Sequence, residues 1–457
     1  MRIDTLSIKN LRLFGDEEQE IHFDSSKNIT VFLGDNGAGK TSILYGCSVL
    51  LSQFYKFFPN CPVKQLTNDD VRTVSSTNKA DFAQIGLKLV PSHPGILEHS
   101  DIGKPYVSAT MTKKGNETKS APNSDLSSIH YYSSVMKQMV DNGNPVALPI
   151  IAFYGTERGH IKPVERRRNF HDVFPRWEVY GKDSLSSATD FKRFFMWFER
   201  NEDIERREWK RIAVETGNTE NGYTSYVLDS VRKALNSLFP NQLQNPRVEM
   251  SPLRFVMDDI TDPQNRIERR LEHMSDGYRI TIALVADIAA RLAEANPSPE
   301  ESGIDNPLHA PGIVMIDEID LHLHPKLQRD ILRRLTNIFP NVQFIVSTHS
   351  PNVVMGALDI IQIIKLKDGK IDSKINEHEY ETYDISLLLL SDLFEGVDVR
   401  TDEYLRENNE YENLLSKSQL TEQDNKRIDE LGKKLKRFSS HEIEMFQEML
   451  NIIKAVV

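Results

Sequence analysis

A glycine-rich stretch near the start of the chain, GDNGAGKT at residues 34–41, constrains the fold more than any other feature. It follows the apolar run ITVFL and has the spacing of a glycine, four residues, and then Gly-Lys-Thr. This is the pattern of a phosphate-binding loop between a strand and a helix, where glycines let backbone N–H groups converge on one point and the helix dipole adds its positive end. The alternative is a glycine-rich turn that binds nothing.

The polar residues of this loop have separate predicted parts. Lys40 is expected to reach the terminal phosphates of a nucleotide, and Thr41 to hold a magnesium ion. The loop residues predicted to bind nucleotide are Gly34, Asn36, Gly37, Gly39, Lys40, Thr41 and Ser42.

A second signal is the run GIVMIDEID, in which four apolar residues precede Asp317 and Glu318. Unpaired buried charge is costly, so a buried strand that ends in two carboxylates needs an explanation, and a magnesium ion on a phosphate supplies one. We expect Asp317 to hold the ion and Glu318 to polarise the attacking water as general base. The alternative is a strand that runs into an acidic turn.

Two further segments each carry one candidate feature. His349, in STHSP after the apolar VQFIV, is expected to touch a γ-phosphate or the attacking water, unless it is a capping or internally bonded loop histidine. In HMSDGYRI, Ser275 is a good N-cap and Gly277 leaves room for a close approach. That segment alone favours an ordinary capped helix. The order of all four signals favours two subunits that sandwich ATP between the loop of one and the Ser-Asp-Gly end of the other.

Composition limits the class of protein. A formal charge of −11 over 457 residues gives no general attraction to nucleic acid or anionic membrane. Two cysteines make no disulfide framework. The N-terminus lacks the apolar core of a signal peptide, and no run approaches the roughly 18 apolar residues of a membrane helix. We therefore expect a cytoplasmic protein that does not bind membranes.

The pattern along the chain predicts four regions. These are an N-terminal ATPase lobe at 1–160, a helical insertion at 161–246, a C-terminal ATPase lobe at 247–382 and a helical region at 383–457. Within the first region, residues 59–145 are predicted to form short strands separated by polar loops. The insertion carries the obvious basic clusters, ERRR at 165–168 and a second one near 205–211. Charge-balanced helix faces are the alternative explanation for both.

With these residues in place, the chain resembles an ATP-binding-cassette ATPase of the SMC, RecF and OLD class. The matching motifs are Walker A (Gly34 to Thr41), the signature (Ser275 to Gly277), Walker B (Asp317 and Glu318), the D-loop IDLHLHP and the switch histidine His349. The resemblance implies an α/β fold, an ABC-type P-loop ATPase head with a layered mixed sheet, and ATP and Mg²⁺ as cofactors. The signature MSDGY departs from the LSGGQ of transporters and argues against a transporter motor.

The resemblance also implies two arginine contacts. NLRLFGD is similar to the N-terminal strand-turn of the family, which places Arg12 near the nucleotide, and AFYGTERG is similar to a segment in which Arg158 reaches the phosphates or the dimer partner. Surface salt bridges explain either arginine equally well. The glutamine that senses magnesium in this superfamily has only Gln84 as a weak candidate.

The overall plan is most similar to the PtuA family of Septu anti-phage systems, with retron-associated relatives and the AriA ATPases of PARIS systems as rivals. This resemblance implies an oligomeric ATPase that scaffolds and regulates a separate HNH- or Toprim-type nuclease, with nucleic acid bound through the complex. The chain itself carries neither nuclease signature. The alternative hypothesis is a RecF- or SMC-like repair ATPase that binds duplex DNA directly.

Overall fold

The structure is a computed structural model. It describes residues 1–76, 78–98, 105–115, 121–159, 175–181, 184–185, 192–217, 223–250, 253–372, 375–396, 402–417 and 421–435. The chain divides into two compact units, Met1–Ile385 and Ser386–Val457. The basic cluster at 165–168 lies outside the described residues. Among the described helices, none combines the length and apolar character needed to cross a membrane.

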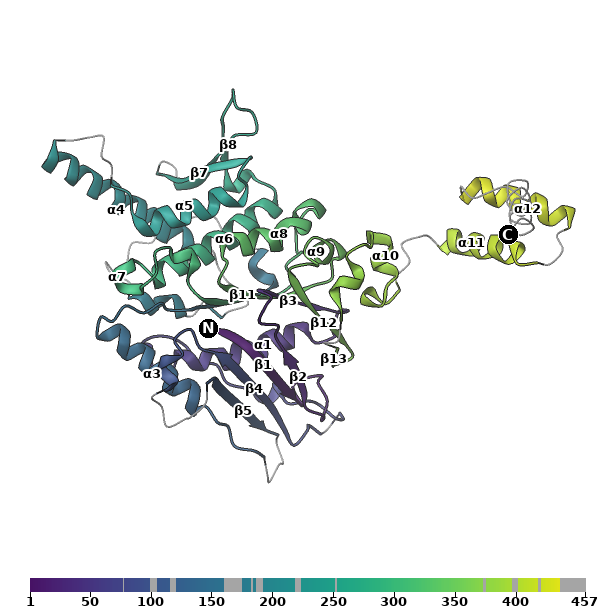
Figure 1. The fold of residues 1–457 in the computed structure, drawn as a ribbon, viewed down its shortest axis with the longest axis horizontal. Helices are drawn as coiled ribbons and strands as arrows, with labels where there is room; N and C mark the ends of the chain where they lie inside the picture. Colours follow the sequence, from purple (N-terminus) through teal and green to yellow (C-terminus); the bar gives the residue numbers. More distant parts are fainter. Residues whose placement is uncertain are drawn as a thin grey trace, which may run out of the picture. The chain divides into compact units, whose positions relative to one another are not determined.

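The core of the first unit is a six-stranded sheet with the order β13-β12-β3-β11-β10-β6 (Figure 1). Its strands are β3 (Ile29–Leu33), β6 (Ile150–Tyr154), β10 (Gly312–Ile316), β11 (Val342–Thr348), β12 (Ile361–Lys367) and β13 (Lys370–Asp372). All neighbours pair in parallel except β13, and every residue of β3, β6, β10 and β11 is buried. Parallel pairing brings the carboxyl ends of these strands to one edge of the sheet.

Two antiparallel sheets accompany this core. The four-stranded sheet has the order β2-β1-β4-β5, and the three-stranded sheet the order β7-β8-β9. The strands are β1 (Arg2–Lys9), β2 (Gln19–His22), β4 (Phe82–Val90), β5 (Val107–Lys114), β7 (Leu243–Met250), β8 (Leu253–Asp259) and β9 (Ile267–Arg270). The helix α1 (Lys40–Leu51) contacts strands of both the four-stranded and the six-stranded sheet.

The helix α6 (Asp276–Ala295) is the most buried helix of this unit. Every residue from 280 to 295 is buried, which fits a helix that is apolar around its whole circumference. Its buried ion pair joins Arg291 Nε to Asp287 Oδ2 at 2.8 Å, and the Tyr154 hydroxyl donates to the same carboxylate at 2.8 Å. The polar groups inside this helix are therefore paired, and one of their bonds ties α6 to β6.

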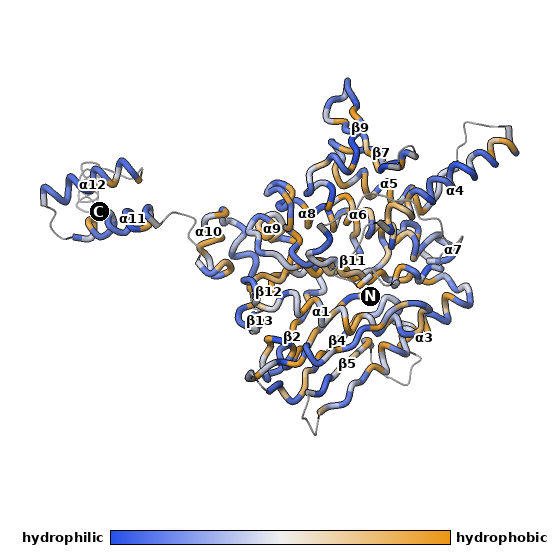
Figure 2. Tube along the Cα trace, turned by 180° about the vertical axis from the view of Figure 1, so that it is seen from behind, coloured by the Kyte–Doolittle hydropathy of each residue, from blue (hydrophilic) through white to orange (hydrophobic). Residues whose placement is uncertain are grey.

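The other helices of the first unit are α2 (Gly95–Glu98), α3 (Ser127–Asp141), α4 (Lys192–Thr216), α5 (Tyr226–Leu238), α7 (Pro299–Ser302), α8 (Pro325–Ile338) and α9 (Pro351–Met355). The short helix α10 (Ile385–Leu390) begins at the last residue of this unit, and its remaining residues belong to the second unit. Figure 2 shows apolar residues gathered along the central strands and α6, whereas most of α4 is hydrophilic.

The prediction of strands alone for residues 59–145 was wrong, because α3 lies in that range. The helix buries Ile129, Tyr132, Ser133 and Met136, which recur at the spacing of one helix face. Two of its five buried residues are serines, Ser128 and Ser133, so the helical period of apolar residues was hard to recognise from the sequence.

The second unit contains α11 (Asp402–Leu415) and α12 (Glu422–Leu435). The two helices share an apolar core of Tyr411, Ile428, Leu431 and Leu435, against which Tyr404, Leu414 and Leu415 pack. Arg427 on α12 also pairs with Glu410 on α11, with Nε to Oε1 at 2.8 Å. Within the described residues, these apolar side chains therefore form the core of a helical hairpin.

Candidate functional site

The phosphate loop (residues 34–41) connects β3 to α1 and adopts a backbone that needs glycine. Gly34, Gly37 and Gly39 have φ values of +152°, +81° and +113°. A Cβ at Gly34 would lie 2.2 Å from the Leu366 carbonyl oxygen on β12, so a larger residue would displace the neighbouring strand. Asn36 is exposed in the loop, and Ser42 is buried in the first turn of α1.

The Lys40 side chain is held within the loop itself. Its Nζ donates to the carbonyl oxygen of Gly34 at 2.6 Å and to that of Asp35 at 2.9 Å. Burial lowers the pKa of this amine, and the nearby carboxylates of Asp317 and Glu318 oppose that shift. The oxygens of these two carbonyl groups therefore lie beside the partly desolvated Lys40 ammonium group, where an anion could otherwise bind.

A chain of hydrogen bonds joins the loop to the ends of β10 and β11. The Thr41 hydroxyl donates to Asp317 Oδ2 at 2.7 Å, and the Ser347 hydroxyl donates to Asp317 Oδ1 at 2.5 Å. Asp317 is only 4% exposed, so both of its oxygens are satisfied by hydroxyl donors rather than by water. Ser347 lies within the segment that sequence analysis singled out, but its role as the link between these motifs was missed.

Glu318 follows with an unusual backbone. Its φ of +49° lies in the left-handed region, which is uncommon for a residue with a Cβ. Its N–H donates to Ser347 Oγ at 2.7 Å, and its side chain is only partly buried. Two residues further, Asp320 Oδ1 accepts a hydrogen bond from the Thr348 hydroxyl. The acidic turn is therefore tied to β11 at two points.

His349 comes directly after β11 at the same edge of the sheet. Its Nε2 is buried and finds no hydrogen-bond partner within the described part of the chain. A buried ring nitrogen without a partner is costly, so this atom fits a ligand that supplies the missing bond. His349 lies two residues after Ser347, whose hydroxyl donates to Asp317.

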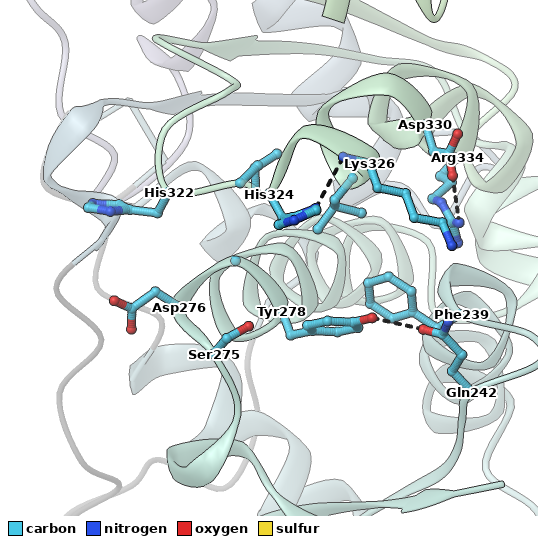
Figure 3. Close-up of a pocket in the computed structure, with 13 residues that line it drawn as sticks. Phe239, Gln242, Ser275, Asp276, Tyr278, His322, His324, Lys326, Asp330 and Arg334 are labelled. Atoms are coloured by element: carbon cyan, nitrogen blue, oxygen red, sulfur yellow. Dashed lines mark hydrogen bonds and ion pairs between the residues drawn. The ribbon is translucent and has the colours of Figure 1, made fainter. Parts of the chain in front are cut away.

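The signature end, Ser275 to Gly277 at the start of α6, is built differently. Ser275 is the N-cap residue, but its side chain makes no capping hydrogen bond and is exposed. A Cβ at Gly277 would lie 3.0 Å from the His322 carbonyl oxygen, so the predicted close approach is made to the D-loop of the same chain. Figure 3 shows this end beside a hollow of about 670 Å³.

The hollow is lined by both polar and aromatic side chains. Tyr278 donates its hydroxyl to Gln242 Oε1 at 2.9 Å, and Arg334 pairs with Asp330 at 3.0 Å (Figure 3). None of its lining residues comes from the phosphate loop. The structure thus brings Lys40, Thr41, Asp317, Glu318 and His349 to one edge of the sheet, while Ser275 and Gly277 belong to a separate surface of the same unit.

The two arginines and the glutamine taken from the family resemblance have protein partners. Arg12 donates Nε to Asp70 Oδ1 at 3.1 Å and lies over the Tyr45 ring of α1, 4.2 Å from its centroid. Gln84 lies on β4 in the four-stranded sheet and donates to the Thr112 hydroxyl at 3.0 Å. The expected nucleotide contact of Arg12 stays a prediction.

Arg158 departs most from expectation. The resemblance predicts that it contacts phosphates or a dimer partner, but it is 2% exposed and its guanidinium donates to backbone carbonyls of Gly155, Asp317 and Glu318. In this conformation its donors face Gly155 and the Walker B turn, and the expected contact with phosphates or a dimer partner stays a prediction.

The residues at this edge fit a nucleotide with a divalent cation. Lys40 supplies a cation whose present partners are only loop carbonyls, and Thr41 and Asp317 supply oxygen ligands of the kind that Mg²⁺ prefers. The partnerless Nε2 of His349 supplies a further polar group. Among the described residues, no group of three or more His, Cys, Asp and Glu side chains forms a metal site by itself.

The second basic cluster of the sequence is neutralised along α4. Arg207 pairs with Asp203, and Arg211 pairs with Glu208 and Glu215. All of these partners lie three or four residues away on the same helix, which is the spacing of intrahelical ion pairs. This part of α4 is a charge-balanced face rather than a basic stripe.

Two family models match the chain. One is described as "AAA domain" and matches residues 5–244, which is more than half of the chain. The other is described as "AAA domain, putative AbiEii toxin, Type IV TA system" and matches residues 175–356.

Individual proteins are similar over different lengths. The "Retron Ec83 probable ATPase" of Escherichia coli is 27% identical over 94% of this chain and 82% of its own length. The "Septu protein PtuA" of Bacillus mycoides is 30% identical over 46% of this chain and 28% of its own length. The solved "SMC head domain from Thermotoga maritima" is 16% identical, with a TM-score of 0.43, over 82% of this chain and all of that one.

Proposed function

The chain belongs to the AAA domain family of ATPases, and from this premise we propose that it binds and hydrolyses ATP between two copies of itself as part of an anti-phage defence complex. The observation that carries the proposal is the hydrogen-bonded chain from Thr41 through Asp317 to Ser347. It links the loop, the acidic turn and the switch-histidine strand, so the groups that a nucleotide needs meet at one edge.

Each group at this edge has a proposed part in hydrolysis. Lys40 exchanges its loop carbonyls for phosphate oxygens, and Thr41 and Asp317 hold Mg²⁺, which neutralises charge on the phosphates. Glu318 accepts a proton from the water that attacks the γ-phosphorus, and the products are ADP and inorganic phosphate. Through its partnerless Nε2, His349 makes a hydrogen bond to the same phosphate or to the attacking water.

The signature end supports a dimer. Ser275 is exposed, makes no capping bond, and begins a helix whose first N–H groups have no partners inside the helix. Such a terminus favours an anion, and in the proposed dimer that anion is the triphosphate held by the loop of the other copy. Ser275 and Gly277 therefore bind nucleotide across the interface.

The defence role rests on the relatives. Two of them are named for retron and Septu systems, and the sequence carries neither an HNH-like nor a Toprim-like nuclease signature. We accordingly assign the cutting step to a separate nuclease subunit, with this chain as its ATP-controlled scaffold. A repair ATPase that clamps duplex DNA itself is less well supported, because the described basic cluster on α4 is internally paired.

Mass measurement of the purified full chain with and without ATP tests the proposal. We expect ATP to double the mass of the particle, or the mass of its smallest assembly. The doubled mass should persist longer in E318Q, because slower hydrolysis preserves the dimer that holds ATP between its two copies. In the same preparations, E318Q should hydrolyse ATP about 100- to 1,000-fold more slowly than the wild type while binding it with similar affinity. The exposed residue Glu300 provides a matched control, E300Q, with unchanged hydrolysis.

Three outcomes would contradict the proposal. A particle whose mass ignores ATP would remove the dimer. DNA cleavage by the isolated chain that disappears in E318Q or H349A would place the nuclease activity in this chain instead. Salt-sensitive DNA binding that ATP strengthens, in the absence of any partner, would favour the repair ATPase.

A further inference from the structure

Arg158 is among the largest fully buried side chains of the described residues, and hydrolysis as proposed above does not use it. Arg158 lies in the short turn Thr156–Gly159 that follows β6. Because β6 pairs in parallel with β10, with Tyr154 opposite Ile316, this turn emerges directly beside the acidic turn of Asp317 and Glu318. The arginine is therefore a neighbour of the catalytic groups without facing solvent.

Its guanidinium is fully engaged with backbone oxygens. Nη1 donates to the carbonyl of Gly155 at 2.9 Å and to that of Asp317 at 2.5 Å, and Nη2 donates to the carbonyl of Glu318 at 2.5 Å. These are charge-assisted bonds, which are shorter and stronger than bonds between neutral groups. The planar fork of arginine can grip two successive carbonyls in a way that a lysine ammonium cannot.

The charge of Arg158 is retained in this burial. Desolvation lowers its pKa to about 10, while the carboxylates of Asp317, Asp320 and Glu318 raise it. The side chain is thus a cation at neutral pH, close enough to these carboxylates for their charges to stabilise it.

The backbone that Arg158 grips is the strained one. Glu318 has a φ of +49°, a left-handed conformation that is unfavourable for a residue with a Cβ. The peptides on either side of its Cα are both fixed: the Glu318 N–H donates to Ser347 Oγ at 2.7 Å, and the Glu318 carbonyl accepts from Arg158. Strain of this kind persists where the surroundings determine it, and it is common where a side chain must be aimed.

From this geometry we infer that Arg158 is a positioning residue for hydrolysis: it clamps the Asp317 and Glu318 carbonyls so that the Glu318 carboxylate is held toward the nucleotide edge of the sheet. This inference rests on the proposed role of Glu318 as general base. It assigns Arg158 no contact with ATP, and so it separates the hydrolytic step from nucleotide binding.

The chain offers a matched control in Arg176. It is also buried, at 9% exposure, and its guanidinium also donates to three backbone carbonyls: those of Ala295 at 2.7 Å, Glu301 at 2.8 Å and Val146 at 2.6 Å. None of these carbonyls belongs to a nucleotide motif. Loss of Arg176 therefore removes the same kind of buried clamp without touching the acidic turn.

The test compares R158Q, R158K and R176Q in the full chain. We expect R158Q to lower kcat about 50-fold while its Kd for ATP stays within about threefold of the wild type. R158K, which keeps the charge but not the fork, should recover part of the loss and stay about 10-fold below the wild type. R176Q should lower the melting temperature as much as R158Q, with kcat within about threefold of the wild type.

The possible results separate the inference from the proposed function. Equal losses of kcat in R158Q and R176Q would mean that Arg158 is only structural, and a parallel loss of ATP affinity in R158Q would mean that it contacts the nucleotide; either result overturns the inference. If R158Q does not fold, R158K carries the test, because wild-type kcat in R158K also overturns it. Wild-type hydrolysis in E318Q would instead remove the proposed function, whatever R158Q does.

Discussion

The phosphate-loop edge and the signature end are built in opposite ways. At the loop edge, polar groups satisfy one another: Lys40 bonds to loop carbonyls, and Thr41 and Ser347 both donate to Asp317. At the signature end, Ser275 is exposed at the tip of a buried helix and its side chain caps nothing. One surface is assembled within the chain, and the other presents its donors outward.

This difference has a physical meaning for the proposed dimer. A network whose members already bond one another is preorganised, so little reorganisation is needed when charge arrives. A helix N-terminus whose N–H groups have no partners can instead bind an anion that another molecule supplies. The comparison therefore predicts different effects for mutations at the two surfaces. Mutations at the phosphate-loop edge should weaken nucleotide binding, whereas mutations at the signature end should prevent the two copies from associating.

The largest expected effect is loss of nucleotide binding in K40A. Removing the only loop ammonium leaves the phosphates without a direct cation from this edge, and we expect ATP affinity to fall at least about 100-fold in calorimetry. K56A, at an exposed lysine beyond the end of α1, serves as the control and should bind normally. Unchanged affinity in K40A would mean that nucleotide binds elsewhere.

The next effect is loss of hydrolysis without loss of binding in S275R. A bulky cation at the exposed N-cap obstructs a second surface but leaves the loop edge intact, so we expect kcat about 30-fold lower with ATP affinity unchanged. The ATP-dependent increase in mass should disappear in parallel. If S275R weakened ATP binding by the isolated copy, the two surfaces would not be separable.

A smaller effect, but a sharper one, comes from mixing the two inactive variants. A heterodimer of K40A and S275R contains one site in which both Lys40 and Ser275 are intact. Random pairing of equal amounts makes half of the dimers mixed, so activity should recover to about a quarter of the wild-type level per chain. Failure to recover, with mixed dimers demonstrated, would end the idea of a shared site.

The smallest effect concerns stability. S275A removes a hydroxyl that makes no capping bond and should leave the free energy of unfolding unchanged. S225A removes the N-cap of α5, whose side chain accepts from the Leu228 N–H, and should cost about 1 kcal/mol. Thermal and denaturant unfolding of the two variants measure this contrast. A loss in S275A equal to that in S225A would show that Ser275 is an ordinary cap.

Some of this site was predictable because its signals are local. The spacing of Gly34, Lys40 and Thr41 sets the backbone of a single turn, and the apolar runs before Asp317 and His349 fix where each strand ends. Since parallel strands of this length meet at one edge, the ends of β3, β10 and β11 had to lie close together once all three belonged to one sheet.

Other parts depend on distant segments and had no such signal. Ser347 became a link only when β11 was placed between β3 and β10. The amphipathic face of α3 was masked by its serines and tyrosines. Arg158 lies about 160 residues from the carbonyls that it grips, and nothing in AFYGTERG distinguishes a buried clamp from an exposed phosphate contact.

The sequence by itself determined the chemistry available to this protein: a glycine-rich loop with the spacing of a phosphate-binding turn, two carboxylates after a buried strand, and a histidine after the next. Tertiary structure alone decided which of these groups bond to each other and which face outward. The physical reason is that glycine freedom and strand burial are properties of neighbouring residues, whereas hydrogen-bond partners and solvent exposure depend on segments brought together from across the chain.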